Sequence, residues 1–521
     1  MAIFKINKEV SNVFMLNGVP SFSEFYNLGI YPWKLMYRGY LADFHNISAP
    51  TINNPSAKRK MNTMRMAKAL CSEMANLVWA EGSKVIVNQK GWDKEEEDPL
   101  QAYIDSVLDK NYFEMKMRQS IEESLALGGS TIRTYAKEKA VGLDGEGNPI
   151  VDYEVGLSYG RADMFVPLSW DNKRITEAVF IEKTAKNGWY WTRLEFHKWN
   201  GVEYVVSNEY YKTQTAPIGN TSQDILGIRS PMSEVWANLP KSVPFYNLQL
   251  GLFTYFRTCM ANNLDDNSPL GISFYANAID TIKALDVAFD SFIMEMKLGK
   301  KRIIVPATAV RKVRDSKGFE YRYFDANDEV YEALNVDSTE SLQIKDNSVE
   351  LRIDEHVKAI NALLNILSVQ VGLSEGSLSF DSARGMKTAT EVISENSKTF
   401  RTVKLMQKPI QKSVQDLIAS IIDVSCAYDI TFDFEGVTYN VYDLVKNGYD
   451  VTVSFDDSII QDRSADLAEG LTLVQNNLIS KKTYLTNYLG YTAEMADAEL
   501  ELMKEENSSS RTINVDWSGV E

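Results

Sequence analysis

The chain has 521 residues, of which 44% are hydrophobic and 24% are charged. That length exceeds one ordinary core and favours two to four domains, and the composition is that of a soluble globular protein. The formal net charge of −16 argues against a protein that holds DNA through a general basic excess, so any DNA contact must be local or loose.

The spacing of cysteines and histidines, and the absence of nucleotide-binding motifs, argue against several classes of enzyme. The 3 cysteines are far apart without CxxC spacing, so we expect free thiols and no zinc site. The 3 histidines do not cluster, which leaves a Ser/His/Asp or Cys/His site unsupported. Because neither a P-loop nor a GxGxxG pattern occurs, we expect no nucleotide hydrolysis. We expect no catalytic residue, no cofactor and no metal. We also expect neither a signal peptide nor a membrane span.

The N-terminal part begins with an aromatic-rich segment and two helices. Residues 1–50 contain many aromatic side chains without a clear period, and we expect this irregular segment to pack over a neighbouring surface. Apolar residues recur at helical spacing in 57–80 and again in 99–127, where Gly128-Gly129 provides a stop. Each of these two stretches therefore predicts an amphipathic helix.

From 130 to 213 the pattern changes to β-strands. Asn187-Gly188 and Asn200-Gly201 each lie between aromatic and β-branched runs, which is the strongest short signal for a hairpin. The region therefore predicts an antiparallel meander.

Two further helices flank a stretch of β character. Apolar spacing predicts helices at 277–298 and 350–371, and the residues between them have the composition of strands and turns. Two helices around a small β insertion form an antiparallel hairpin with a module at its tip. A polar loop, 373–387, follows the second helix.

A long helix is predicted directly after this loop, over 388–426. Thr388 and Glu391 form a capping box, in which the hydroxyl accepts from the N–H of Glu391 and the carboxylate reaches back to the cap N–H. Pro409 lies inside the helix and cannot donate to the carbonyl of Leu405, so we expect a kink there. Strands and then two or three short helices complete the chain.

Basic residues recur along the long helix at a spacing of three or four, which places them on one face: Lys398, Arg401, Lys404, Lys408 and Lys412. Two interpretations of this basic stripe stay open. It is either a solvated face, or a contact with phosphates or with acidic neighbours.

Several stretches resemble the portal proteins of tailed bacteriophages. Gly385–Val403 (GMKTATEVISENSKTFRTV) resembles the segment that joins a portal's tunnel loop to its long kinked helix. Three more stretches resemble parts of the wing, of the stem with the clip, and of the crown: ESLALGGSTIRTY, SPLGISFYANAIDTIKALDVAFDSF with GKKRIIVP, and FDDSIIQDRSADLAEGLTLVQNNLISKKTYL. These stretches are spread through the chain, so the resemblance covers nearly all of it, and it is strongest to portals of long-tailed phages of Gram-positive hosts.

This resemblance implies an α+β portal fold with an α/β wing, a two-helix stem, a small β clip, a long kinked helix and a helical crown, assembled into a ring. The implied division, in chain order, is the wing 1–276, first stem helix 277–298, clip 299–349, second stem helix 350–372, tunnel loop 373–387, long kinked helix 388–426, wing strands 427–457, crown 458–506 and flexible tail 507–521.

The resemblance also implies the function. The ring, usually of twelve copies, forms the channel at one special capsid vertex through which genomic DNA is packaged and ejected. It nucleates head assembly with scaffold and major capsid protein, docks the terminase and then binds head–tail adaptor proteins. The ATPase belongs to the terminase, so this chain is expected not to be an enzyme. Its expected place is the virion, after assembly in the host cytoplasm.

The candidate DNA contacts that follow from the resemblance lie in and beside the tunnel loop: Ser377, Ser379, Ser382, Arg384 and Lys387. Such polar and basic side chains can give brief phosphate contacts without sequence preference. Twelve copies of a chain with net charge −16 carry about −190 in total, and such a repulsive wall lets the duplex slide.

Two alternatives stay open. Another head–tail structural ring, such as an adaptor or a minor capsid protein, would bind no terminase and take no part in packaging. A nucleic-acid-processing enzyme would use the acidic pairs Asp265-Asp266 or Asp456-Asp457 to hold a metal ion. Surface or helix-start carboxylates explain these pairs as well.

Overall fold

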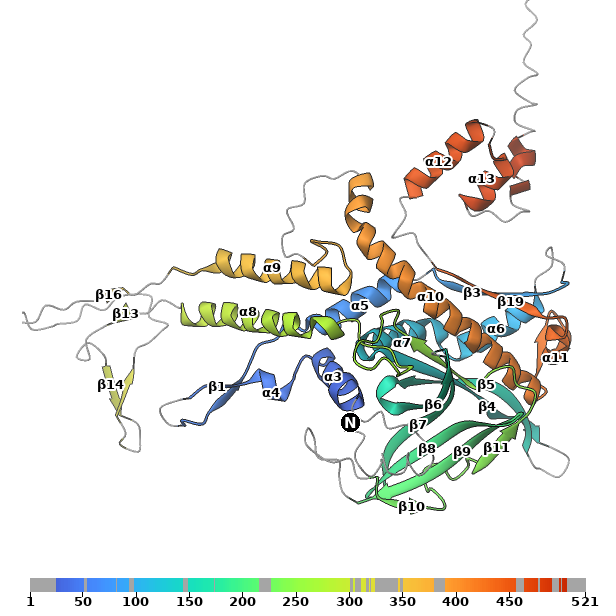
Figure 1. Cartoon of the computed structure of the whole chain (residues 1–521), viewed down its shortest axis with the longest axis horizontal. Coiled ribbons are helices and arrows are strands. Elements are labelled where there is room, and N and C mark those ends of the chain that lie inside the picture. The colour runs from blue at the N-terminus through green and yellow to red at the C-terminus, as the bar shows by residue number, and fades with distance from the viewer. Residues whose placement is uncertain are drawn as a thin grey trace, which may run out of the picture.

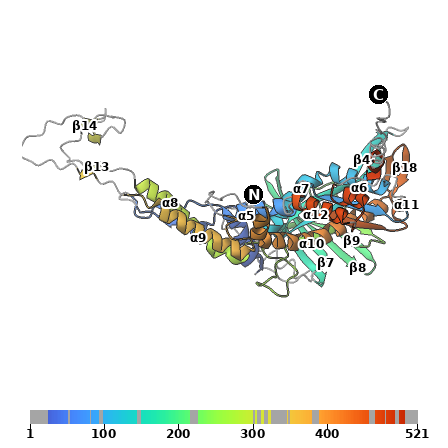
Figure 2. The same ribbon diagram turned by 90° about the horizontal axis from the view of Figure 1, so that it is seen from above.

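A hairpin of two helices projects from a body of mixed helices and sheets in the computed structural model of the chain (Figures 1 and 2). Helices and antiparallel strands occur together, as the predicted α+β class requires. The structure describes residues 25–50, 54–80, 82–92, 98–143, 149–172, 174–214, 226–299, 303–304, 311–314, 318, 320–323, 345–346, 350–378, 389–455, 463–476, 478–489, 496–497 and 499–503.

The N-terminal aromatic segment is helical where it is described. It forms η1 (Tyr26–Ile30), α3 (Tyr31–Tyr37) and α4 (Ala42–His45). The expectation of an irregular segment was therefore wrong for these residues, but the expected packing is confirmed. Trp33 is fully buried, and its carbonyl accepts a hydrogen bond from the Tyr275 hydroxyl at 2.6 Å.

A small β-hairpin precedes the first long helix of the body. Strands β1 (Asn46–Ser48) and β2 (Lys58–Lys60) pair antiparallel, and α5 (Met66–Val78) follows them. The helix predicted over 57–80 was thus too long at its start, since β2 occupies its first residues. Its apolar face is confirmed, with Leu70 fully buried.

The helix predicted over 99–127 is two helices, α6 (Pro99–Lys110) and α7 (Phe113–Leu127). The break lies at Tyr112, whose φ of 53° is left-handed and cannot continue a right-handed helix. The predicted stop is confirmed, because Gly128 ends α7 with a φ of 86°.

The predicted antiparallel meander is confirmed, although it is divided between two sheets. One sheet has the strand order β12-β4-β5, and the other has the order β10-β9-β8-β7-β6, with β11 also paired to β9. The strands are β4 (Gly129–Leu143), β5 (Pro149–Arg161), β6 (Phe165–Asp171), β7 (Arg174–Lys186), β8 (Trp189–Asn200), β9 (Glu203–Thr213), β10 (Ile228–Ser230), β11 (Ser242–Phe245) and β12 (Phe253–Arg257), with η2 (Ala162–Met164) between β5 and β6. Asn187 and Gly188 both have positive φ, as a tight hairpin turn between right-twisted strands requires.

The projecting hairpin consists of α8 (Ile279–Leu298), preceded by η3 (Ala276–Ala278), and α9 (Ile353–Val371). Both helices fall where apolar spacing predicts them. They pack on each other near the tip, where the rings of Phe292 and His356 lie 5.9 Å apart. His356 is therefore a packed residue.

Short strands lie between the two helices, in agreement with the β character of that part of the sequence. β13 (Ile303–Ile304) pairs antiparallel with β16 (Lys345–Asp346), and β14 (Arg311–Arg314) pairs antiparallel with β15 (Glu320–Tyr323).

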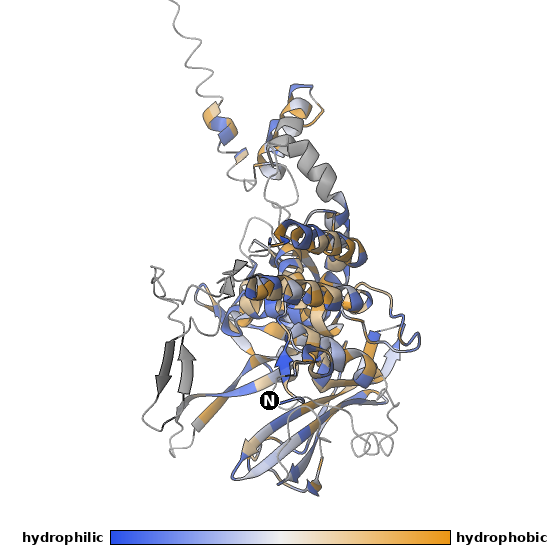
Figure 3. Ribbon diagram, turned by 90° about the vertical axis from the view of Figure 1, so that its left-hand side faces the viewer, coloured by the Kyte–Doolittle hydropathy of each residue, from blue (hydrophilic) through white to orange (hydrophobic). Residues whose placement is uncertain are grey.

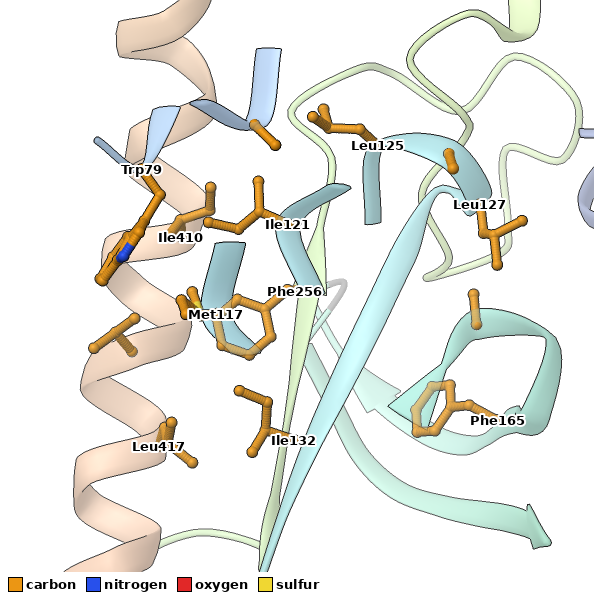
Figure 4. Packing of buried hydrophobic residues seen from close by; sticks show 14 of the residues in the cluster. Trp79, Met117, Ile121, Leu125, Leu127, Ile132, Phe165, Phe256, Ile410 and Leu417 are labelled. Atoms are coloured by element: carbon orange, nitrogen blue, oxygen red, sulfur yellow. The ribbon is translucent and has the colours of Figure 1, made fainter. Parts of the chain in front are cut away.

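The predicted long helix is α10 (Ala389–Ala427), and its apolar side forms one wall of the core. Figure 4 shows Ile410 and Leu417 of this helix beside Phe256 and Ile121, and all four side chains are buried. Burial of each such side chain contributes about 1.5–3 kcal/mol, so the core fixes the position of α10 on the body.

The remaining elements cover the outer side of the body and the C-terminal end. β3 (Lys84–Gln89) pairs antiparallel with β19 (Tyr449–Ser454). The others are β17 (Thr431–Phe434), β18 (Val437–Asn440), α11 (Val441–Val445), α12 (Arg463–Gln475) and α13 (Lys481–Asn487). Helix α11 interrupts the region where only strands were expected, whereas the short C-terminal helices are confirmed.

Candidate functional site

The predicted loop residues fall only partly within the described structure. Ser377 is described and is exposed, just after α9. The other loop candidates lie outside the described residues: Ser379, Ser382, Arg384 and Lys387. Thr388 and the side chain of Glu391 lie outside them as well, so the capping box at the start of α10 stays a prediction.

Helix α9 ends at a position that requires glycine. Gly372 has a φ of 80°, and its N–H donates to the carbonyls of Ser368 and Val369. A Cβ at this position would lie 2.9 Å from Thr402 Oγ1. The left-handed residue turns the chain off the helix, and the absent side chain lets the turn lie directly against α10.

Four residues fasten the start of the loop to α10, and we call them the loop clasp: Gly372, Ser374, Thr399 and Thr402. The N–H of Ser374 donates to Thr399 Oγ1 at 2.9 Å, and the N–H of Thr399 donates to Ser374 Oγ at 3.2 Å. The Thr402 hydroxyl donates to the Gly372 carbonyl at 2.7 Å. Ser374 and Thr399 are buried, so water does not compete for these bonds. The clasp holds the first loop residues against α10.

The residues of the basic stripe have unequal surroundings. Lys398 is half-buried and donates to the carbonyl of Val369 at 3.1 Å, at the negative end of the α9 dipole. Lys412 pairs with Asp416 at 3.2 Å, and Arg174 pairs with the same carboxylate. The middle three residues are exposed: Arg401, Lys404 and Lys408. Both ends of the stripe contact other elements of the fold, at Lys412 through the Asp416 carboxylate shared with Arg174, and the three middle side chains are exposed.

Helix α10 continues through Pro409, so the predicted proline position inside the helix is correct. The carbonyl of Leu405 has no N–H donor four residues later, and Leu405 is itself 53% exposed. Water can therefore reach the side of the helix where that carbonyl needs a donor. A kink at Pro409 stays a prediction.

A family model described as phage portal protein, SPP1 Gp6-like, matches residues 33–512. The match spans α8, α9, the loop clasp and α10. The chain belongs to the phage portal protein family. A search of curated proteins found no match. The family is one of structural proteins of the capsid vertex, not one known for catalysis.

In this portal protein, sequence reasoning missed a set of polar contacts that joins the N-terminal segment to α8. We call it the α8 brace: His45, Arg59, Asn62, Asp286 and Asp290. Arg59 donates two bonds to the Asp290 carboxylate at 2.8 and 2.5 Å, and the backbone and side-chain N–H groups of Asn62 donate to the same carboxylate. His45 Nε2 lies 3.0 Å from Asp286 Oδ2, with both side chains buried. The sequence does contain a signal for these contacts. Asp286 and Asp290 lie four residues apart on the apolar side of the helix predicted over 277–298.

Electrostatics favour the ionised form of Asp290 in the brace. The hydrogen bonds from Arg59 lower the pKa of Asp290 to about 2, although burial by itself would raise it. The N–H groups of Asn62 act in the same direction as Arg59. Asp290 is therefore a carboxylate at neutral pH, compensated by a guanidinium from a segment far away in the sequence.

A cavity of about 560 Å³ lies between α7 and strands β4, β5 and β7, and a buried ionic cluster forms part of its wall. Arg133 donates to Glu182 and Glu195 at 2.5 and 2.7 Å, and Arg193 pairs with the same two carboxylates. Burial lowers the pKa of His197, whose Nε2 lies 2.9 Å from Glu195. Two arginines against two glutamates balance the charge of this cluster, which joins β4, β7 and β8.

The part of the chain that the structure describes contains no helix long and apolar enough to span a membrane. Among the same residues, no group of three or more His, Cys, Asp or Glu side chains could hold a metal ion. The Asp265 carboxylate accepts from the N–H groups of Asn267 and Ser268, as a turn residue does. The second acidic pair, Asp456 and Asp457, lies outside the described residues.

Proposed function

We propose that this portal protein assembles into a ring of twelve copies, the channel through which the genome is packaged into the capsid and later ejected. The family match over residues 33–512 carries the proposal, because it covers the body, the hairpin and α10 together. In this function the chain is structural, and the energy for DNA movement comes from the terminase.

Family membership also supports the proposed partners. The ring nucleates head assembly with scaffold and major capsid protein in the host cytoplasm. It docks the terminase during packaging and then binds head–tail adaptor proteins in the finished virion. The predicted wing, stem, clip and crown are proposed as the parts that make these contacts.

We further propose that DNA is contacted by loop 373–387 and by the exposed middle of the basic stripe. The loop clasp supports this idea, because it fixes the root of the loop beside Arg401 and Lys404 on the same helix. Contacts of this kind are weak and independent of sequence. Because each copy carries a net charge of −16, the rest of the channel repels DNA and limits its adhesion.

Electron microscopy of the purified chain tests the proposed ring directly. Class averages are expected to show hollow rings with twelvefold symmetry, because a closed cyclic assembly repeats one interface around an axis. A compact monomer under every assembly condition would contradict the proposal. Rings of another copy number would correct the stoichiometry alone.

Removal of Ser377–Ser382 tests the role of the loop. The shortened chain is expected to form normal rings, because the clasp residues are untouched. It should package or retain DNA about tenfold less well, since three of the contact candidates are lost and the shorter loop carries Arg384 and Lys387 less far from α10. The measurement is nuclease-protected DNA per assembled head. The variant Ser379→Ala with Ser382→Ala keeps the loop length and removes two hydroxyls, so it separates the effect of length from that of the hydroxyl contacts. Full packaging by the shortened chain would contradict the DNA role.

A further inference from the structure

Strand β5 is the outer strand of the sheet β12-β4-β5, so one of its edges faces away from β4 (Figure 1). Its pairing with β4 runs without a bulge from Arg161, opposite Ser130, to Val151, opposite Ala140. In an antiparallel strand, alternate residues direct both of their backbone groups, the N–H and the C=O, to the same neighbour. Every second residue of β5 therefore presents its backbone groups to the edge that β4 leaves free.

The side chain of Asn111 identifies the residues that face this free edge. Its amide oxygen accepts from the N–H of Leu157 at 2.9 Å, and its amide nitrogen donates to the carbonyl of Val155 at 2.9 Å. Asn111 thus takes the place of a neighbouring strand at these two residues. By the same alternation, the next residues that face the free edge are Tyr159 and Arg161. Apart from the ladder with β4, the backbone hydrogen bonds of the described residues include none to Tyr159 or Arg161.

This part of the free edge borders the cavity of about 560 Å³ between α7 and β7, because residues 158–161 line it. The volume lies within the range of about 300–1,000 Å³ that is usual for binding sites. Phe180 and Trp236 give the cavity an apolar wall. The Tyr159 hydroxyl and the Arg133 Nε are buried and have no hydrogen-bond partner among the described residues. The cavity therefore holds polar groups that the rest of the described fold does not satisfy.

The cavity is basic, although the chain as a whole has a net charge of −16. Glu182 is paired with Arg133 and Arg193. Burial raises the pKa of Glu123, and the nearby charge of Arg161 opposes that rise. The four basic side chains of the lining are Lys116, Arg133, Arg161 and Lys183, against the two carboxylates Glu123 and Glu182. The lining therefore attracts acidic groups.

We propose that the free edge at Tyr159 and Arg161 binds an extended acidic peptide of another protein, which pairs with β5 as an added strand inside this cavity. We call this place the β5 edge site. Unpaired backbone groups of an edge strand are a template for pairing with another chain, and main-chain hydrogen bonds supply the affinity. The edge offers carbonyl acceptors as well as N–H donors. A peptide backbone satisfies both, whereas a phosphate backbone carries acceptors alone.

The two sides of the β5 edge site favour acidic side chains on the added strand. Successive side chains of a strand point to opposite sides. Figure 3 shows the corresponding mixture of hydrophobic and hydrophilic residues along strands of the body. One set of side chains of the added strand faces α7, which contributes Lys116, and the other set faces β7, which contributes Lys183. Carboxylates in either set therefore meet an opposite charge.

Binding of a synthetic peptide tests the β5 edge site. The probe is fluorescein-labelled Thr-Val-Asp-Val-Glu-Val-Thr-amide, whose β-branched residues favour an extended chain. Fluorescence polarisation with the full chain is expected to show saturable binding that weakens as salt is added, since salt screens the charges. The same peptide with N-methylated backbone amides is expected not to bind, because it has no N–H to donate to β5. Absence of binding by the first peptide, or equal binding by both, would overturn the inference.

Reversal of one charge in the lining tests the preference for acidic peptides. Lys116→Glu is expected to weaken binding about tenfold, because a carboxylate replaces an ammonium beside the added strand. The matched control is Arg118→Glu, the same change of charge on the same helix. Arg118 donates to Asn76 of α5 at 2.6 Å and does not line the cavity, so binding should be unchanged. Equal weakening by the two variants would contradict the site.

Hydrogen exchange resolved to single amides locates the bound peptide. The N–H groups of Tyr159 and Arg161 are expected to exchange more slowly in the complex, because each gains an acceptor. The N–H of Leu157 already donates to Asn111 and should not change, which makes it an internal control. Slower exchange only in other parts of the chain would place the peptide elsewhere and overturn the inference.

The same binding measurement on assembled rings separates an outside partner from other occupants of the edge. Rings are expected to bind the peptide as free chains do. Binding by free chains alone would assign the edge to a second copy of this chain. Binding only after removal of residues 1–24 would assign it to that segment. Either result would overturn the inference of an outside partner and leave the proposed ring function standing.

Discussion

Alanine in place of Gly128 is expected to lower the free energy of unfolding by about 3–4 kcal/mol. The φ of 86° costs any L side chain about 1–2 kcal/mol. In addition, a Cβ would lie 2.2 Å from the carbonyl oxygen of Gly271. That oxygen belongs to the backbone and cannot rotate away, so α7 and the segment before α8 must move apart. The measurement is urea denaturation followed by circular dichroism.

Gly188→Ala is the matched control, because it separates backbone strain from the close approach. Gly188 has a φ of 75°, and a Cβ there would meet nothing within 4 Å. We expect a loss of about 1–2 kcal/mol, from the left-handed conformation alone. Equal losses from the two variants would show that the contact between Gly128 and Gly271 contributes nothing.

Asp290→Ala is expected to release the β1–β2 hairpin from α8 and to speed tryptic cleavage at Lys58, Arg59 and Lys60. Without the carboxylate, Arg59 and Asn62 lose hydrogen bonds to a buried anion, at a cost of about 3 kcal/mol. Since 1.4 kcal/mol is a factor of ten, cleavage should rise on the order of a hundredfold. Mass spectrometry of the first cleavage products measures this rate.

The stability that Asp290 contributes to the brace is expected to depend on pH, because only the ionised carboxylate pairs with Arg59. The pKa of Asp290 falls from 3.8 to about 2 in the folded chain, so its contribution is complete above about pH 4. It is lost as pH falls from about 4 to about 2. Hydrogen exchange of the peptide that contains Asn62 should show this loss in the native chain and not in Asp290→Ala. Asp290→Asn keeps the size without the charge, and a pH response from it would contradict the assignment.

The sequence by itself determined the elements whose signal is local. Apolar residues at a spacing of three and four define α8, α9 and α10, because one face of each helix is buried in any fold that uses it. Gly128 ends α7 and Asn187-Gly188 turns between β7 and β8, since positive φ is a property of a single residue or pair. The resemblance of several stretches to portal proteins was sufficient to predict the family, which the family model confirms.

Only the tertiary structure decided which polar residues hold elements together. Arg59 and Asp290 are 231 residues apart, and Ser374 and Thr399 are 25 residues apart. Each pair forms only when packing places its two segments in contact, so no local pattern predicts it. The same reason applies to the basic stripe. Spacing put Lys398 and Arg401 on one face of α10, but the end of α9 made Lys398 a helix-end contact and left Arg401 exposed.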